Sequence, residues 1–240
     1  MIPSRTPSHA SVRRRLRRWI TRLFGDLTDL FFRRQIFLEY SDVVRANNAA
    51  RDPPEFDQWV RRHYAEAAAL AVRRIVGQPK DRRSISLVRV LGEVESNRRA
   101  FSRSWLRQRA AAREKSSHWG DNLIDRLVGS KARFIPVRWC QSRRRRILRC
   151  SQCLRRYVDK SVAHHDRRGV SGRLPTFDDL TSAVDEIDRV LVEVFLLITG
   201  DSFRTAFPYP NGNWRKVFMK AWLPEDRSAW PERRLAERRD

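Results

Sequence analysis

Hydrophobic positions recur at intervals of three and four along most of this chain, which is the period of an α-helix packed on one side. No stretch shows the alternation of apolar and polar residues, bounded by hairpin turns, that is typical of a β-strand. The predicted fold class is therefore all-α. A chain of 240 residues is long enough for one main helical domain with tails.

Proline, glycine and apolar stripes divide the first half of the chain into helices. A first core helix is expected over residues 27–45, and a second from about residue 55 to residue 76, before Gly77. A third begins near Ser84, and residues 96–117 are predicted as a short helix with a loop. The stripes expected to be buried are Phe32, Ile36, Tyr40 and Val43, then Phe56, Val60, Tyr64, Ala67 and Ala71, then Leu87, Leu91 and Val94.

Two long helices are predicted in the second half. Neither proline nor glycine interrupts residues 137–166, which would form a helix about 45 Å long if they are continuous. The last core helix begins after Pro175, and its unbroken stripe is typical of the seam of a bundle or of a homodimer. That stripe consists of Phe177, Leu180, Val184, Ile187, Leu191, Val194 and Ile198.

The same pattern predicts three regions. Residues 1–25 are expected to form a disordered basic tail, although an Arg- and Ser-rich amino terminus can also mimic an organellar transit peptide. Residues 26–200 form the helical domain. Residues 201–240 are expected to be irregular and to pack back on the bundle; a stacking platform for bases is the alternative. The aromatic residues of this last region include Trp214, Trp222 and Trp230.

The charge is large and uneven. The chain has 51 Lys and Arg against 28 Asp and Glu, a net charge of +23. Residues 1–25 and 126–158 contain no acidic residue and carry most of the excess. Such segments attract polyanions, so nucleic acid is the first expected partner and an anionic membrane surface is the second. No apolar run is long enough to span a bilayer.

Most ordinary enzyme classes lose support from the absence of their motifs. The sequence has no phosphate-binding glycine loop, no nucleophile elbow and no acidic cluster for magnesium, and we expect no cofactor. Cys140, Cys150 and Cys153 occur without a secretory signal, which favours a reducing cytoplasm.

Paired histidines close the cationic 137–166 segment. Histidine exchanges a proton near neutral pH, so His164 could deprotonate a ribose 2′-hydroxyl while Arg156 and Lys160, on the same helix face, hold the phosphate. His165 falls on the apolar face, where a packed histidine is the more common outcome. RNA cleavage and an ordinary structural role both stay open for these residues.

An arginine run in the same segment is expected to guide the RNA backbone: Arg143, Arg144, Arg145, Arg146 and Arg149. A zinc site is the competing chemistry, because Cys150 and Cys153 have C-x-x-C spacing and two histidines follow. In one continuous helix, however, Cys153 and His164 would be about 16 Å apart, so no metal is expected.

Three stretches resemble the HEPN superfamily of helical, nucleotide-associated domains, in its AbiU-type branch from abortive-infection systems. The resemblance spans roughly residues 26–222. It is carried by Ala71-Val72-Arg73-Arg74 with Ser84-Ile85-Ser86-Leu87, by Tyr157-Val158-Asp159-Lys160-Ser161-Val162-Ala163-His164-His165-Asp166, and by Trp214-Arg215-Lys216-Val217-Phe218. For Arg73 and Arg74 we favour a structural role, pairing with a carboxylate or facing water.

The resemblance implies a metal-independent endoribonuclease assembled across a homodimer, in a toxin or phage-defence setting with a possible cognate antitoxin. Its site in many members is an Arg, four to six residues, then a His. Here seven residues separate Arg156 from His164, and Lys160 has the four-residue spacing before His165. Lysine lacks the planar fork of arginine. The alternatives are a non-catalytic RNA- or nucleotide-binding module and a helical interaction protein whose basic tail contacts lipid.

Overall fold

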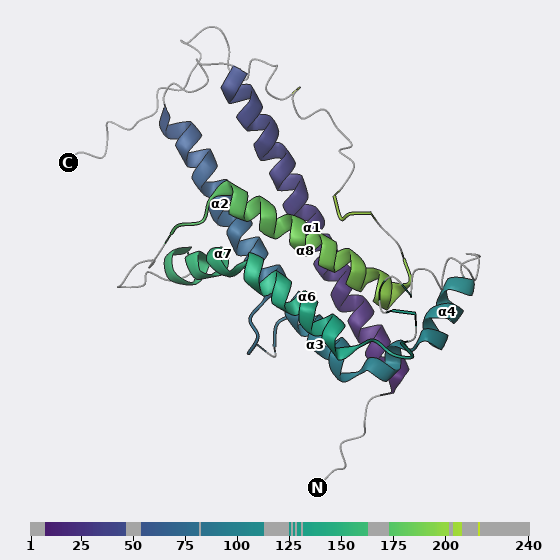
Figure 1. Ribbon diagram of the computed structural model, residues 1–240. Helices are drawn as coiled ribbons and strands as arrows, with labels where there is room; N and C mark the ends of the chain where they lie inside the picture. The colour runs from purple at the N-terminus through teal and green to yellow at the C-terminus, as the bar shows by residue number, and fades with distance from the viewer. Residues whose placement is uncertain are drawn as a thin grey trace, which may run out of the picture.

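The computed structural model describes residues 8–46, 54–81, 83–112, 125, 127, 129–130, 132–162, 173–201, 204–207 and 216. Over these residues the fold is all-α, and its only sheet-like contact is one isolated bridge between Ser102 and Phe134. In chain order the elements are α1 (His9–Ala46), α2 (Pro54–Val76), α3 (Leu87–Ser96), the 3₁₀ turn η2 (Arg98–Phe101), α4 (Arg103–Ala111), α6 (Val137–Cys150), α7 (Gln152–Tyr157), the π-helical turn η3 (Val158–Val162) and α8 (Phe177–Thr199) (Figure 1).

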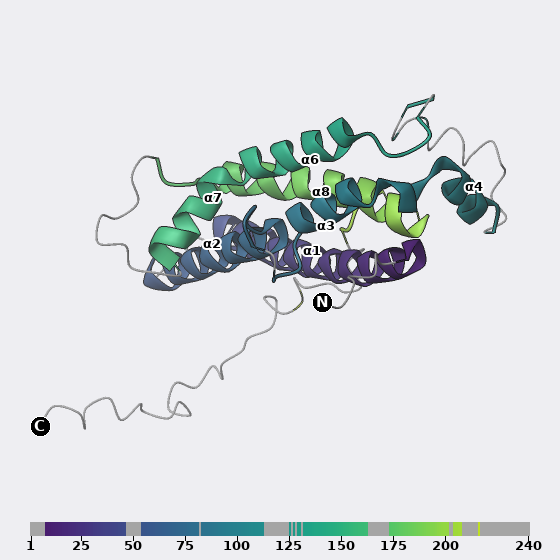
Figure 2. The same ribbon diagram turned by 90° about the horizontal axis from the view of Figure 1, so that it is seen from below.

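The helices are stacked in layers. α1 and α2 lie side by side as an antiparallel pair along the lower edge of Figure 2. α8 and α3 pack on this pair, and α6 covers both of them from above. α7 turns away from the end of α6 and reaches α2. α6 and α7 together therefore pack against the middle layer of α3 and α8 from above and at one end. No helix in the described part of the chain is long and apolar enough to cross a membrane.

α1 begins much earlier than the sequence pattern suggested. Val12, Leu16, Ile20 and Leu23 are at most 1% exposed and belong to the main core. The prediction of a disordered tail over residues 1–25 is therefore wrong from His9 onward. Arginines fill the solvent side of these turns and obscured a regular apolar face in the sequence.

The stripes of α1 and α2 are rotated from their predicted positions. Of the four positions expected on α1, only Tyr40 is buried, next to Phe37 and Val44. In α2, Phe56 is 56% exposed, and the buried residues lie in the second half of the helix: Ala68, Ala69, Val72, Ile75 and Val76. The first half of α2 projects with the end of α1 past the rest of the bundle, so it has little surface to pack against (Figure 1).

α3 and α8 agree with their predicted stripes. Leu87, Leu91 and Val94 are fully buried in α3, and Ser86 caps its first turn. In α8 every predicted stripe residue is buried except Phe177, which is 42% exposed. Thr176 and Asp179 form a capping box at its start, and Gly200, with φ +76°, ends it.

The long helix predicted over residues 137–166 is broken at Ser151. This residue is fully buried, and its Oγ donates a hydrogen bond to the carbonyl oxygen of Ile147 at 2.5 Å. A serine hydroxyl bonded to the carbonyl four residues earlier bends a helix without proline or glycine. α6 therefore ends at Cys150, α7 follows at an angle, and η3 continues with π geometry.

The carboxyl-terminal region is described only in part. Ala206 is buried, and its amide and the Thr205 hydroxyl donate hydrogen bonds to Asp188 of α8 at 2.7 Å each. The ring of Phe207 meets that of Phe31 edge-on. These residues dock on the bundle as expected, whereas Trp214, Trp222 and Trp230 lie outside the described residues.

Candidate functional site

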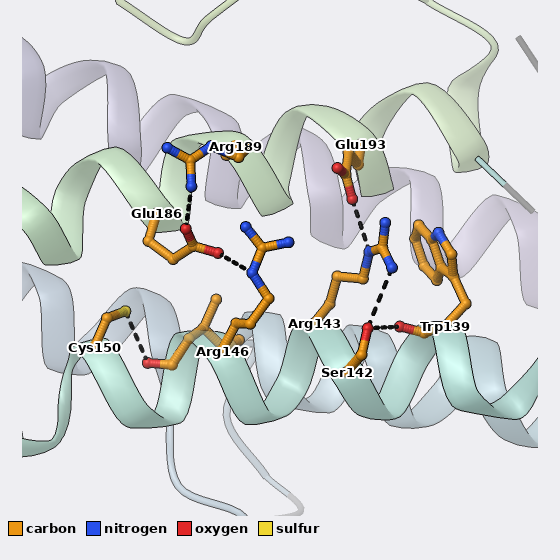
Figure 3. A network of polar contacts seen from close by, with 9 residues as sticks. Trp139, Ser142, Arg143, Arg146, Cys150, Glu186, Arg189 and Glu193 are labelled. Atoms are coloured by element: carbon orange, nitrogen blue, oxygen red, sulfur yellow. Dashed lines mark hydrogen bonds and ion pairs between the residues drawn. The ribbon is translucent and has the colours of Figure 1, made fainter. Parts of the chain in front are cut away.

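The arginine run of α6 faces acidic residues of α8. Arg143 Nε donates to Glu193 at 2.8 Å, and Arg146 Nε lies 2.7 Å from Glu186 (Figure 3). Glu186 also pairs with Arg189 of its own helix. The Arg143 and Glu193 side chains are only 19% and 25% exposed, so the ion pair lies inside the helix interface. These two arginines fasten α6 to α8.

A third arginine of the run faces α3. Arg144 lies 3.1 Å from Glu95, and the amide of Gln141 donates to the same carboxylate at 2.9 Å. Only Arg145 of the four consecutive arginines is exposed. The acids that neutralise the run lie on α3 and α8, outside the acid-free segment of residues 126–158.

The bend between α6 and α7 opens a cavity of about 480 Å³ toward the start of α8. We name it the arginine cavity after Arg149, Arg156 and Arg173, whose side chains are all exposed. The complete lining consists of Arg149, Cys150, Gln152, Cys153, Arg156, Arg173, Asp179 and Ser182. Arg149, Cys153 and Arg156 are spaced by four and three residues and line the cavity together despite the bend, and Arg173 joins them from the segment before α8.

The charge of the arginine cavity is positive. Arg173 donates to Asp179 at 2.8 Å, and this bond together with bonds from Thr176 lowers the pKa of Asp179 to about 2. Asp179 is therefore ionised at neutral pH, but it balances only one of the three guanidinium groups. The Ser182 hydroxyl adds a neutral donor. Such a lining suits an anion with several oxygen acceptors.

All three cysteines are free thiols; Cys140 is buried, and Cys150 and Cys153 are half-buried. Burial and the nearby Glu carboxylates raise the pKa of Cys140 to about 12 and that of Cys150 to about 11. Cys153 Sγ donates a hydrogen bond to the carbonyl oxygen of Arg173 at 3.6 Å, so two lining residues of the arginine cavity are in direct contact. Over the described residues, no group of three or more His, Cys, Asp or Glu side chains could hold a metal ion.

Asp159 connects α2 to η3. Arg73 Nε donates to Asp159 at 2.7 Å, and Arg74 pairs with Asp26 at 3.2 Å. The structural role favoured for these two arginines is confirmed. The half-buried Arg155 adjoins the same carboxylate; burial lowers its pKa and the attraction of Asp159 opposes that shift. Two stretches that carry the HEPN resemblance thus contact each other.

The proposed catalytic residues are only partly placed. Arg156 is exposed in the arginine cavity, whereas Lys160 lies in η3, is half-buried and does not line that cavity. His164 and His165 lie outside the described residues. Arg173, Asp179 and Ser182 were missed by sequence reasoning, because nothing in their spacing shows that the start of α8 returns to the α6–α7 bend.

Comparisons of this chain with protein-family models, with curated proteins and with solved structures found no match.

Proposed function

We propose that this chain binds RNA by its phosphate backbone at the arginine cavity. The observation that carries this proposal is the convergence of Arg149, Arg156 and Arg173, from three separate segments, on one cavity of about 480 Å³. A guanidinium grips phosphate oxygens bidentately, and pockets of roughly 300–1,000 Å³ enclose small ligands. One or two nucleotides of a strand would fit such a space.

The charge of the whole chain supports a polyanion over a small acidic ligand. A net charge of +23 draws a phosphate backbone from a distance and releases its counterions on contact. The HEPN resemblance supports RNA as the polyanion. Single-stranded RNA is the better fit, because a cavity receives individual phosphates of a flexible strand more readily than those of a rigid duplex.

Metal-independent cleavage of that RNA, in the manner of a HEPN endoribonuclease, is the second candidate function. It is favoured by the position of Arg156, since an exposed guanidinium in the cavity could stabilise charge on a phosphorane. In this candidate His164 is the general base, with His165 and Lys160 as further participants. A cytoplasmic homodimer, a phage-defence or toxin role and a cognate antitoxin belong to this proposal.

Binding is tested with a labelled single-stranded RNA of mixed sequence, by fluorescence anisotropy over a series of salt concentrations. The double variant Arg149→Gln, Arg156→Gln should lose about tenfold or more in affinity. Its salt slope, the slope of the logarithm of the binding constant against the logarithm of the salt concentration, should fall in magnitude by about 1.4. The matched control is Arg98→Gln, Arg99→Gln, which removes two exposed arginines of η2 that form no ion pair with a described residue. Equal losses in both double variants would show that the cavity has no special role.

Cleavage is tested in EDTA with labelled single-stranded and structured RNAs, comparing wild type with His164→Ala and His165→Ala. The catalytic candidate expects metal-independent products that disappear in one histidine variant while RNA affinity is kept. Intact RNA with salt-sensitive binding would remove the catalytic candidate and leave the binding proposal standing.

A further inference from the structure

The amino-terminal half of α1 presents a second set of exposed arginines. Arg14, Arg17, Arg18 and Arg22 are all exposed, and they form no ion pair with any described residue. At 100° per residue they fall within an arc of about 140°, opposite the face buried in the core. We name this surface the α1 arginine stripe.

The stripe differs from the other arginines of the same helix. Arg13 donates to the carbonyl oxygen of Ala100 at 2.9 Å and lies 5.1 Å from the Trp105 ring. Arg15 pairs with Glu93 at 2.5 Å. Arg13 and Arg15 thus hold α1 against the elements that pack on it, and the stripe arginines make no comparable contact in the described structure.

Within the described part of the chain, the surface next to the stripe is open at Gly25. Gly25 follows Arg22 by three residues on the same arc, and a Cβ built there would meet no atom of another part of the chain within 4 Å. Figure 2 shows α1 along the lower edge of the bundle, with α6 along the opposite edge. The stripe therefore lies on the helix at one edge of the bundle, and the arginine cavity begins at the carboxyl end of the helix at the opposite edge.

We infer that the α1 arginine stripe is a second binding surface, which takes the phosphate backbone of a double-stranded nucleic acid without reading its sequence. From Arg14 to Arg22 the stripe extends about 12 Å along a rigid helix. This length covers several phosphates of a duplex, whose strands present their charges at fixed spacing. The inference stands apart from the function proposed for the cavity.

The residues of the stripe favour the backbone of a duplex over a single strand or an anionic membrane. The stripe is a row of charges along a rigid helix, unlike the cavity proposed for single-stranded RNA. Its remaining positions from residue 11 to residue 25 are Ser11, Thr21 and Gly25, so it also offers no aromatic ring on which the bases of a single strand could stack. An amphipathic helix that lies in a membrane inserts an apolar face. Here the apolar face of α1, including Leu16 and Ile20, is fully buried in the core.

The test uses RNA and DNA duplexes of about 20 base pairs, which exceed the length of the stripe. Arg14, Arg17, Arg18 and Arg22 are replaced together by Gln in one variant and by Lys in another. In the Gln variant the salt slope of duplex binding should fall by up to about 3.6, equally for RNA and DNA, while the Lys variant keeps most of the slope. Circular dichroism should show the same melting midpoint in all three proteins, because the four side chains are exposed.

The cavity variant and anionic vesicles serve as two controls for the loss of duplex binding. The cavity variant Arg149→Gln, Arg156→Gln should retain the duplex slope that the stripe variant loses. Vesicles of phosphatidylcholine with one third phosphatidylserine should bind the wild type and the Gln variant equally weakly. An unchanged duplex slope in the Gln variant would overturn the inference, and so would loss of vesicle binding with duplex binding intact.

Discussion

α1 and α6 both carry dense runs of arginine in segments without acidic residues, yet the two helices use them differently. In α6, Arg143, Arg144 and Arg146 each reach a glutamate of another helix. In α1, the stripe arginines face solvent. The difference arises because α6 is covered by α3 and α8 on the sides where its arginines lie, whereas the stripe lies opposite the core.

The contrast shows that a cationic run in sequence is not yet a binding surface. A cationic run attracts a polyanion less where acids of the same chain neutralise it, and for α6 those acids lie on other helices. A partly buried pair such as Arg143 and Glu193 contributes to cohesion between helices, although desolvation offsets much of its attraction. An exposed guanidinium that no acid of the chain neutralises keeps its charge available to a phosphate, although water and salt screen the attraction.

The largest effect is expected on the buried side of α1. Leu16 is fully buried, so Leu16→Ala should lower the free energy of unfolding by about 2–5 kcal/mol. The neighbouring Arg17→Ala, on the stripe, should change it by less than about 0.5 kcal/mol. Denaturant unfolding followed by circular dichroism measures both. Equal, small effects would mean that residues 9–25 are not part of the core.

Loss of an α6 ion pair should be the next largest effect. Arg143→Gln leaves Glu193 partly buried without its partner, and we expect a loss of about 1–3 kcal/mol. Arg145→Gln, the exposed neighbour in the same run, is the matched control and should be nearly neutral. A destabilisation of the same size in both variants would remove the distinction between paired and exposed arginines.

Changes at the amino-terminal cap of α8, beside the arginine cavity, should lower the free energy of unfolding by a smaller amount, and part of this effect should depend on pH. Thr176→Ala should cost about 1 kcal/mol. The pKa of Asp179 is about 2 in the folded chain, below its value of about 3.9 in unfolded chains. The ionised Asp179 carboxylate therefore stabilises the fold fully above about pH 4, and this stabilisation is lost as the pH falls toward 2.

Asp179→Asn should accordingly destabilise the protein at neutral pH and have less effect as the pH falls through this window. Thermal melts at several pH values give the comparison. A difference between Asp179→Asn and wild type that stays constant from neutral pH down to pH 2 would contradict the ion pair with Arg173.

The last prediction concerns the rate at which Cys140 reacts with a thiol reagent, a measurement that leaves the stability of the fold unchanged. Because burial raises the pKa of Cys140 to about 12, its thiol should react with N-ethylmaleimide far more slowly in the native protein than in denaturant. Mass spectrometry after a short exposure identifies the modified residue. Equal rates in both states would mean that Cys140, a residue of α6, is not buried in the core.

The sequence predicted the α-helical class and the helices whose apolar stripe and end signals agree. α8 is the clearest case, since Thr176 and Gly200 mark its two ends and its stripe is unbroken. The start of α1 was missed because arginines alternate with its apolar residues. The bend at Ser151 was missed because a buried serine hydroxyl, unlike proline, breaks a helix only in some surroundings.

The candidate site was predictable only where it lies on one continuous segment. Arg149 and Arg156 share a helix face that periodicity can assign. Arg173 and Asp179 join them through the return of the chain to α8, and Glu186, Glu193 and Glu95 neutralise the α6 run from a distance in sequence. Tertiary contacts of this kind leave no spacing signal in the sequence.

The most direct test of this account compares two double variants in single-stranded RNA binding over a series of salt concentrations. Arg149→Gln, Arg156→Gln alters the arginine cavity, and Arg143→Gln, Arg146→Gln removes the same charge from the α6 ion pairs. At a temperature where both are folded by circular dichroism, the cavity variant should lose about 1.4 from the salt slope. The α6 variant should keep the slope and melt at a lower temperature. The reverse result, with RNA binding lost from the α6 variant and kept by the cavity variant, would contradict the account.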